Sequence, residues 1–354
     1  MTTHHAQSAH SSSEGARRTS AILITGAGGE IGHGLIEQLA ARPGSIIVAL
    51  DLHELEPSLR EKCQAAYVGD ICDNALLTRV LAKYEITEIY HLAALLSTRA
   101  EYVPAAAHDV NVRGTLNLLE LAAEQARSHG QRVRFMFPSS IAVYGMPDQA
   151  TKKQAGKVHE REWCQPATMY GCNKLYCEHL GRYYDQHYRQ LAKDRIREIV
   201  DFRAIRFPGI ISAHTLPSGG TSDFAPEMIH AAAQAKPYAC FVRADTRIPF
   251  MSMPDAIAAL LTLAGASEAS LTQVVYNIGA FNPSAGEFAE RVQQAFPGAE
   301  ITFEPDEQRQ AIVDSWPEDV NDDAARADWN YAPSHTLERA FTEYLVPVIK
   351  ARYQ

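Results

Sequence analysis

The sequence predicts an α/β protein with a doubly wound parallel sheet and a smaller C-terminal substrate-binding lobe. From Ala21 to Arg206, short apolar runs alternate with longer amphipathic stretches, which is the pattern of repeated strand–helix–strand units. The first apolar run leads directly into a glycine-rich turn and then a helical pattern, as at phosphate-binding turns. A chain of 354 residues is long enough for one large domain with a second lobe.

The expected elements follow from hydrophobic periodicity. Short apolar runs predict strands over 21–24, 45–50, 64–68, 86–92, 132–137 and 200–206. Amphipathic stretches predict helices over 31–41, 76–84, 104–128 and 169–189. Pro43 and Gly44 end the first of these helices.

We expect three parts. Residues 1–20 are rich in Ser, Thr and His and lack the apolar segment of a secretory signal, so they predict a disordered tail. Residues 21–210 are expected to form the main domain, with a strand and helix near 250–263 returning to it. Residues 211–350 are expected to form the substrate-binding lobe, because a polar loop rich in Gly, Ser and Thr follows Gly209.

Composition argues against several function classes. A net charge of −9 is unsuited to binding nucleic acid or an anionic membrane, and no apolar run of about 18 residues predicts a membrane span. The six cysteines form no CxxC pair, which predicts no metal site and a reduced, cytoplasmic protein. Neither HExxH nor GxSxG occurs, so zinc proteases and α/β-hydrolases have no support.

The glycine-rich turn predicts a dinucleotide site. Gly26 permits the tight turn, Gly29 lets the backbone approach a pyrophosphate, and Gly32 lets helix pack on strand. The predicted cofactor-binding residues in this turn are Gly26, Gly28, Gly29, Glu30 and Ile31.

Asp51 ends the second predicted strand, where a carboxylate can accept hydrogen bonds from the adenosine ribose. It would repel a 2′-phosphate, and the next three residues, 52–54, include no arginine to offset that repulsion, so NAD is favoured over NADP. Weaker candidates stand at the ends of the next two strands: Asp70, Ile71, Leu92, Ala93 and Ala94.

Tyr170 and Lys174 form a YxxxK pattern that places both side chains on one face of a helix. The lysine ammonium is expected to lower the pKa of the tyrosine, so that the tyrosine can act as a base near neutral pH. Ser140, at the end of the fifth predicted strand, can hydrogen-bond the reacting oxygen, and Ser139 is the less favoured donor.

The ordered segments TGAGGEIG, GDICD, HLAA, NVRGT, PSSIAVYG and YGCNK resemble the extended short-chain dehydrogenase/reductase family, over 21–345. The resemblance implies a Rossmann fold and a proton relay through Tyr170 and Lys174. It also implies a structural role near the cofactor for Asn111, and a homodimer in which helices about 104–128 and 169–190 form a four-helix bundle.

A narrower resemblance links the chain to the short-chain type of L-threonine 3-dehydrogenases. HLAALLS at 91–97, RFPGIIS at 206–212, PSGGTSDFA at 217–225 and DSWP at 314–317 carry it. It implies NAD-dependent oxidation of the β-hydroxyl of L-threonine or a similar small β-hydroxy acid. It adds Pro208 and Ile210 to the cofactor site, and it assigns to the substrate Ser97, Ser140, Tyr170, Gly220, Thr221 and Trp316.

Within that assignment, the turn 219–222 offers N–H groups and hydroxyls to a substrate carboxylate, and Trp316 would close the pocket. The chain departs from the family pattern at Ser218, Ser222 and Phe224, which permits a different β-hydroxy acid.

Two alternatives stay open. A nucleotide-sugar epimerase or dehydratase of the same family would need a diphosphate site, for which Lys236, Arg243 and Arg247 are candidates. A non-enzymatic dinucleotide sensor needs no base, so the set Ser140, Tyr170 and Lys174 argues against it.

Overall fold

The structure is a computed structural model that describes residues 18–196, 198–217 and 220–354. Residues 1–17 of the predicted tail lie outside this part. The last two residues of that predicted tail are not disordered, because strand β1 begins at Thr19. Arg18 donates hydrogen bonds to the Leu81 carbonyl and to the Ser128 hydroxyl, which hold the start of this strand against the domain.

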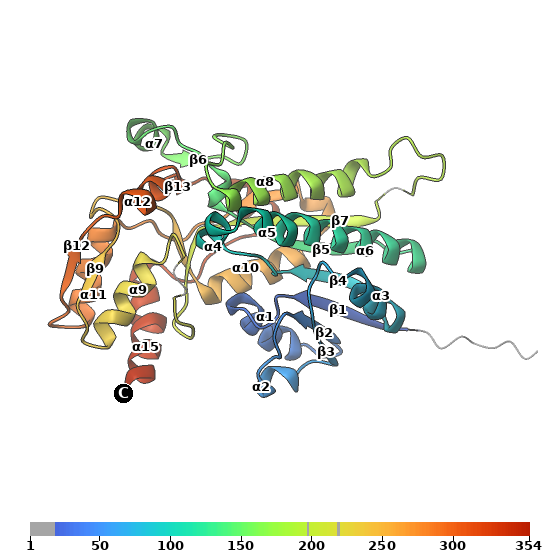
Figure 1. Ribbon diagram of the computed structural model, residues 1–354, viewed down its shortest axis with the longest axis horizontal. Helices are drawn as coiled ribbons and strands as arrows, with labels where there is room; N and C mark the ends of the chain where they lie inside the picture. The colour runs from blue at the N-terminus through green and yellow to red at the C-terminus, as the bar shows by residue number, and fades with distance from the viewer. Residues whose placement is uncertain (1–17, 197, 218–219) are drawn as a thin grey trace, which may run out of the picture.

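A seven-stranded parallel sheet forms the centre of the molecule (Figure 1). Its order is β11-β7-β5-β4-β1-β2-β3, so the direction of winding reverses between β1 and β4. The strands are β1 (Thr19–Thr25), β2 (Ile47–Asp51), β3 (Ala65–Val68), β4 (Tyr84–His91), β5 (Val133–Ser140), β7 (Val200–Phe207) and β11 (Val275–Asn277).

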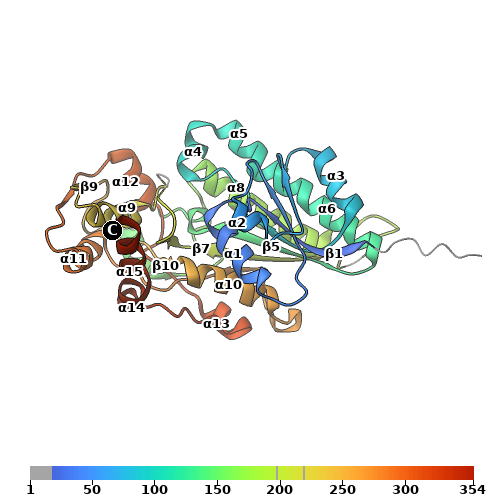
Figure 2. The ribbon, with the colours of Figure 1, turned by 90° about the horizontal axis from the view of Figure 1, so that it is seen from below.

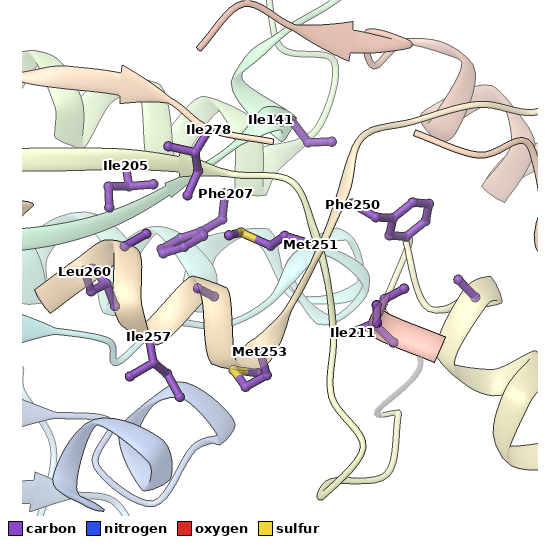
Figure 3. Packing of buried hydrophobic residues seen from close by; sticks show 14 of the residues in the cluster. Ile141, Ile205, Phe207, Ile211, Phe250, Met251, Met253, Ile257, Leu260 and Ile278 are labelled. Carbon is purple, nitrogen blue, oxygen red and sulfur yellow. The ribbon is translucent and has the colours of Figure 1, made fainter. Parts of the chain in front are cut away.

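Helices cover both faces of this sheet (Figures 1 and 2). One face carries α3 (Asn74–Lys83), α6 (Gly114–His129) and α8 (Met169–Arg182), and the other carries α1 (Glu30–Ala40) and α10 (Met253–Gly265). Each face has its own buried apolar cluster, and the cluster under α1 and α10 continues into the second lobe. Figure 3 shows part of that cluster, in which Phe207 of β7 lies on one side of α10 and Ile257 of α10 points away from it, toward α1. The doubly wound architecture predicted from the sequence is confirmed.

The long helix expected over 104–128 is not a regular α-helix. It consists of α5 (Pro104–His108), a π-helical turn η1 (Asp109–Arg113) and α6. The expected helix over 169–189 likewise ends its regular part at Arg182 and continues as a π-helical turn, η3 (Tyr183–His187). Hydrophobic periodicity does not distinguish a π turn from an α-helical one over so few residues.

The second lobe lies beyond the carboxyl edge of the sheet (Figure 2). Two short parallel pairs organise it: β8 with β10, and β9 with β12. Its principal elements are β8 (Gly209–Ile211), α9 (Phe224–Ala233), β9 (Tyr238–Cys240), β10 (Phe250–Ser252), α11 (Ala285–Ala295), β12 (Ile301–Phe303), α12 (Glu307–Asp314) and α15 (Val346–Tyr353).

The elements near 250–263 differ in part from expectation. Helix α10 packs on α1 and β7 of the main domain, but strand β10 pairs with β8 in a separate two-stranded sheet. Pro208 separates β8 from β7 and has no N–H for a ladder, which lets the chain leave the main sheet there. The strand that returns to the main sheet is β11, which pairs with β7.

The remaining elements are short. They are α2 (Pro57–Arg60), α4 (Ser97–Tyr102), η2 (Ile141–Val143), α7 (Gln149–Ala155), β6 (Lys157–Val158), η4 (Glu268–Ser270), β13 (Asp319–Val320), α13 (Asp323–Trp329), α14 (Leu337–Arg339) and η5 (Ala340–Leu345). Within the described ranges, no helix combines the length and the apolar character needed to cross a bilayer.

Candidate active site

One cavity lies along the carboxyl ends of the parallel strands and extends toward the second lobe. It includes the point between β1 and β4 where the winding reverses, which is where ligands bind in open α/β sheets. Of the predicted site residues, all line this cavity except Asn111 and Thr221. Residues that are more than 280 positions apart in the chain therefore meet in one place.

The glycine turn after β1 has the shape that a pyrophosphate requires. Gly26 has a φ of +67°, and a Cβ there would lie 2.6 Å from the Ala93 nitrogen. A Cβ on Gly32 would lie 2.5 Å from the Ala27 carbonyl oxygen, so helix α1 approaches the turn too closely for a side chain. The N-terminus of α1 consequently faces the cavity and favours negative charge there.

Asp51 is held in place at the end of β2. Its Oδ2 accepts a hydrogen bond from the Gly28 nitrogen at 2.9 Å, and its Oδ1 accepts one from the His53 nitrogen at 3.1 Å. The carboxylate lines the cavity and retains acceptor capacity for ribose hydroxyls. Among the described lining residues, Lys174 is the only lysine or arginine, so neither residue type lines the cavity at Asp51 to pair with a 2′-phosphate. The residues therefore fit NAD.

Ser140, Tyr170 and Lys174 meet at the other end of the cavity. Helix α8 begins at Met169, where the Thr168 hydroxyl caps it by accepting from the Gly171 nitrogen at 3.1 Å. The Tyr170 hydroxyl is hydrogen-bonded with Ser140, the last residue of β5. Lys174 lies one turn further along α8, with its Nζ 5.5 Å from the centre of the Tyr170 ring.

Burial governs the protonation of this group. It raises the pKa of Tyr170 above its ordinary value, and the hydrogen bond with Ser140 lowers that pKa only in part. It also lowers the pKa of Lys174 to about 8, which Cys177 and Glu178 oppose. Contrary to the sequence-based expectation, the pKa of Tyr170 is raised, because burial of the phenol outweighs any effect of the neighbouring ammonium. The Lys174 ammonium donates to the Pro138 carbonyl at 2.6 Å.

A buried ion pair supports this constellation from behind. Arg206, at the end of β7, donates from Nε and Nη2 to the two oxygens of Glu178 at 2.8 and 2.6 Å. The Ser139 hydroxyl donates to the same carboxylate at 2.5 Å. Glu178 stands one helical turn after Lys174, so the pair joins the helix that carries Tyr170 to the strand ends beneath it. This pair was not predicted from the sequence, although Arg206 begins the RFPGIIS segment and Glu178 lies four residues after Lys174.

His91 ties β4 to its neighbours beneath the cavity. Its Nδ1 lies 2.8 Å from the Thr25 hydroxyl and its Nε2 lies 2.9 Å from the Thr115 hydroxyl. Burial and, to a smaller extent, the charge of Lys174 together lower the pKa of His91 to about 3. The imidazole is therefore neutral at physiological pH.

This arrangement predicts acid sensitivity. Because the pKa of His91 is lower in the folded chain than in the unfolded chain, the unfolded state gains a proton first as the pH falls below about 6.5. Stability is then lost, by roughly 2 kcal/mol at about pH 5 for this one group. Denaturation of wild type and His91→Gln between about pH 7.5 and 5 measures the effect, with exposed His108→Gln as the control. Equal pH dependence in all three proteins would contradict it.

The substrate end of the cavity is built by loops from both lobes. The Ser97 hydroxyl accepts from the Thr221 nitrogen at 3.4 Å and from its hydroxyl at 3.1 Å. Asn111 accepts from the Leu95 nitrogen at 2.8 Å and donates to the Leu95 carbonyl at 3.0 Å. Thr221, which was assigned to the substrate, stands behind the cavity lining and does not form it. Asn111, which was placed near the cofactor in a structural role, also stands behind the lining and holds Leu95, which lines the cavity.

Asp223 also lines this end and was not among the predicted residues. Its Oδ2 accepts from the Gly220 nitrogen at 2.7 Å, which closes a tight turn before α9. Ser218 and Gly219, part of the expected anion-binding turn, lie outside the described residues. The position of Asp223, after a polar loop and before a helix, was a signal that the sequence contained. Trp316 lines the same end and is 4% exposed.

The three basic residues considered for a diphosphate site do not line the cavity. Arg243 pairs with Asp314, and Arg247 pairs with Glu287. Neither arginine lines the cavity, and Lys236 is exposed outside it. The cationic diphosphate site expected for a nucleotide-sugar enzyme is therefore not formed by these three residues.

Comparison with known proteins agrees with this geometry. Residues 22–279 match the model of the NAD dependent epimerase/dehydratase family. A mitochondrial L-threonine 3-dehydrogenase of Bos taurus is 34% identical over 95% of this chain and 84% of its own length. An uncharacterized epimerase/dehydratase of Staphylococcus saprophyticus is 31% identical over 94% of this chain and 97% of its own.

Solved structures give the same result. The holo form of a GalE-like L-threonine dehydrogenase from Cupriavidus necator superimposes with a TM-score of 0.80, at 33% identity over 94% of this chain and all of the other. The apo form of a monomeric L-threonine 3-dehydrogenase of metagenomic origin gives a TM-score of 0.82 at 34% identity, over 94% of this chain and all of the other. A UDP-glucose 4-epimerase from Thermotoga maritima, 18% identical with a TM-score of 0.76 over 94% and 98% of the two chains, shares the fold.

Proposed function

Since this chain belongs to the NAD-dependent epimerase/dehydratase family and is an NAD-dependent oxidoreductase, we propose that it oxidises the β-hydroxyl of L-threonine or a similar small β-hydroxy acid. The proposal rests chiefly on the charges at the substrate end of the cavity. Asp223 supplies a carboxylate there, and Lys174 is the only lysine or arginine among the described lining residues.

These charges favour a small zwitterion over a nucleotide diphosphate. An α-ammonium group finds an acceptor in Asp223, whereas a diphosphate would meet that carboxylate in a cavity whose described lining holds no lysine or arginine besides Lys174. The hydroxyls of Ser97 and Ser222 offer donors to the substrate carboxylate. Trp316 covers the same end and limits the size of what can bind.

The proposed chemistry is the removal of one proton and one hydride. Only the deprotonated form of Tyr170 can accept the proton of the β-hydroxyl, and because burial raises the pKa of this phenol, the tyrosinate needs the positive charge of the Lys174 ammonium beside it. The Ser140 hydroxyl donates to the substrate oxygen as negative charge develops on it. Lys174 holds charge beside the tyrosine. Bound NAD would supply the acceptor for the hydride of the β-carbon. From L-threonine the product is 2-amino-3-oxobutanoate, a β-keto acid that readily loses CO₂.

The test is NADH formation by the purified protein with NAD. L-threonine is compared with L-serine, with 3-hydroxybutanoate, which lacks the ammonium group, and with UDP-sugars. We expect oxidation of L-threonine or another β-hydroxy amino acid, little with 3-hydroxybutanoate, and a strong preference for NAD over NADP. Conversion of a UDP-sugar without oxidation of any β-hydroxy acid would establish the epimerase alternative instead.

We also propose a cytoplasmic homodimer. All six cysteines are free, as expected in a reducing compartment. Helices α6 and α8 pack side by side and leave three large hydrophobic side chains exposed: Leu116 on α6, Tyr176 on α8 and Tyr183 on the turn η3. We expect sedimentation to report a dimer, and Tyr176→Glu to shift it toward monomer. A wild-type monomer at micromolar concentration would contradict the assembly. One relative of known structure is a monomeric L-threonine 3-dehydrogenase.

A further inference from the structure

Helix α7 and strand β6 form a small unit at the edge of the molecule, beside β13 and α12 (Figure 1). Asp148 caps α7 by accepting from the Thr151 nitrogen at 2.7 Å, and Gly156, with a φ of +60°, ends it. Strand β6 then pairs with β13, which lies only a few residues beyond Trp316. The unit thus attaches to the segment that carries a wall of the proposed substrate pocket.

Lys152 of α7 is unusual because its side chain is 2% exposed. Its ammonium donates to the carbonyl of Val313 at 3.1 Å, in the last turn of α12. A cation at the C-terminal end of a helix interacts favourably with the carbonyl groups that lack helical partners. The same Val313 carbonyl accepts from the Trp316 nitrogen at 3.2 Å, so the ammonium and the Trp316 backbone share one acceptor.

Other contacts hold the same short segment. The Met146 nitrogen, in the loop that follows Ser140 and Tyr144, donates to the Ser315 carbonyl at 2.7 Å. Arg243 forms a bidentate pair with Asp314 at 2.8 and 3.0 Å. At the other end of α12, Arg309 donates to the Gly220 carbonyl at 3.0 Å, next to the Asp223 turn. Helix α12 therefore touches both sides of the substrate end of the cavity.

We propose that Lys152 is a positioning residue for the substrate pocket. By donating a hydrogen bond to the Val313 carbonyl, it holds α12 and Trp316 in the place where they form a wall of that pocket. The identity of the substrate in this proposal rests on the proposed function, whereas the contacts of Lys152 with α12 do not depend on it. Lys152 does not line the cavity. Its removal should therefore weaken substrate binding and leave the proton and hydride steps unchanged.

The electrostatics distinguish this role from a purely structural one. The charged groups that face Lys152 are Asp314 at the end of α12, Glu318 in the segment after it, and Arg243 and Asp245 from the turn that follows β9. Burial lowers the pKa of Lys152 to about 8, the three carboxylates oppose that shift, and Arg243 adds to it. Because its pKa falls on folding, the buried ammonium costs stability at neutral pH, and this cost disappears as the pH rises above 8.

The decisive variant is Lys152→Met, which keeps most of the side-chain volume and removes the ammonium. Lys153→Met, an exposed change on the same helix, is the matched control. For Lys152→Met we expect KM for the amino-acid substrate to rise about 3- to 10-fold with kcat within about twofold, and an unfolding temperature no lower than that of the control. In a Trp316→Phe background the effect of Lys152→Met on KM should be much smaller.

Two further measurements do not need a known substrate. Hydrogen exchange of the peptide covering 311–318 should be faster in Lys152→Met than in Lys153→Met. In the wild type this exchange, corrected for its intrinsic pH dependence, should increase between about pH 7 and 9 as Lys152 loses its charge.

The outcomes separate the two proposals. If the wild type oxidises no β-hydroxy acid, the proposed function fails, and hydrogen exchange alone decides the role of Lys152. If the wild type is active, then an unchanged KM, an equal KM effect in the Trp316→Phe background, or a lowered unfolding temperature with normal exchange would each overturn the positioning role.

Discussion

Replacing Tyr170 with Phe is expected to lower kcat by about 10²- to 10⁴-fold, the usual contribution of a positioned proton-transfer group. The Phe ring keeps the packing of the first turn of α8 and removes only the hydroxyl, which is buried and hydrogen-bonded with Ser140. Affinity for NAD, measured by the quenching of protein fluorescence, should change little. The loss should therefore appear in turnover and not in cofactor binding.

Tyr176→Phe is the matched control for this variant. Tyr176 lies on the same helix and is 53% exposed, so the loss of its hydroxyl should leave kcat unchanged. If Tyr170→Phe retained full turnover, Tyr170 would not be the base. If it lost NAD binding together with turnover, the defect would be structural.

Replacing Glu178 with Gln should lower the free energy of unfolding by about 3–5 kcal/mol, because it leaves the Arg206 guanidinium buried without a counter-ion. The two side chains are 2% and 4% exposed, so water does not compensate for the lost charge. The Ser139 hydroxyl also loses a carboxylate acceptor. Since Glu178 anchors α8 one turn after Lys174, activity of the folded fraction should fall as well.

Chemical denaturation followed by circular dichroism measures this loss. The control is Glu343→Gln, which breaks an exposed ion pair with Arg339 on the surface of the second lobe and should leave the midpoint unchanged. A Glu178→Gln protein as stable as that control would show that the buried pair contributes little and that α8 is held by packing alone.

The main sheet and the catalytic motifs could be predicted from sequence because each depends on local features. A buried strand and a glycine turn occupy neighbouring residues, and the four-residue spacing of Tyr170 and Lys174 is a property of a single helix. Asp51 and Ser140 follow from the same reasoning, since the carboxyl ends of parallel strands meet at one edge of the sheet. The comparisons confirm the family and NAD, while the roles of individual residues stay predictions.

The substrate end depended on the tertiary structure. Asp223 and Trp316 are separated by more than 90 residues, and only the folding of the second lobe brings them to one cavity. The bonds of Asn111 to Leu95, of Glu178 to Arg206 and of Lys152 to Val313 span 16, 28 and 161 residues. Hydrophobic periodicity predicts which face of a helix or strand is buried, but it does not predict which distant residue that face contacts. Those contacts depend on the packing of the whole core and on the need of each buried polar group for a hydrogen-bond partner. The sequence by itself therefore determined the fold and the cofactor turn, and tertiary packing decided which side chains surround the substrate and which hold them there.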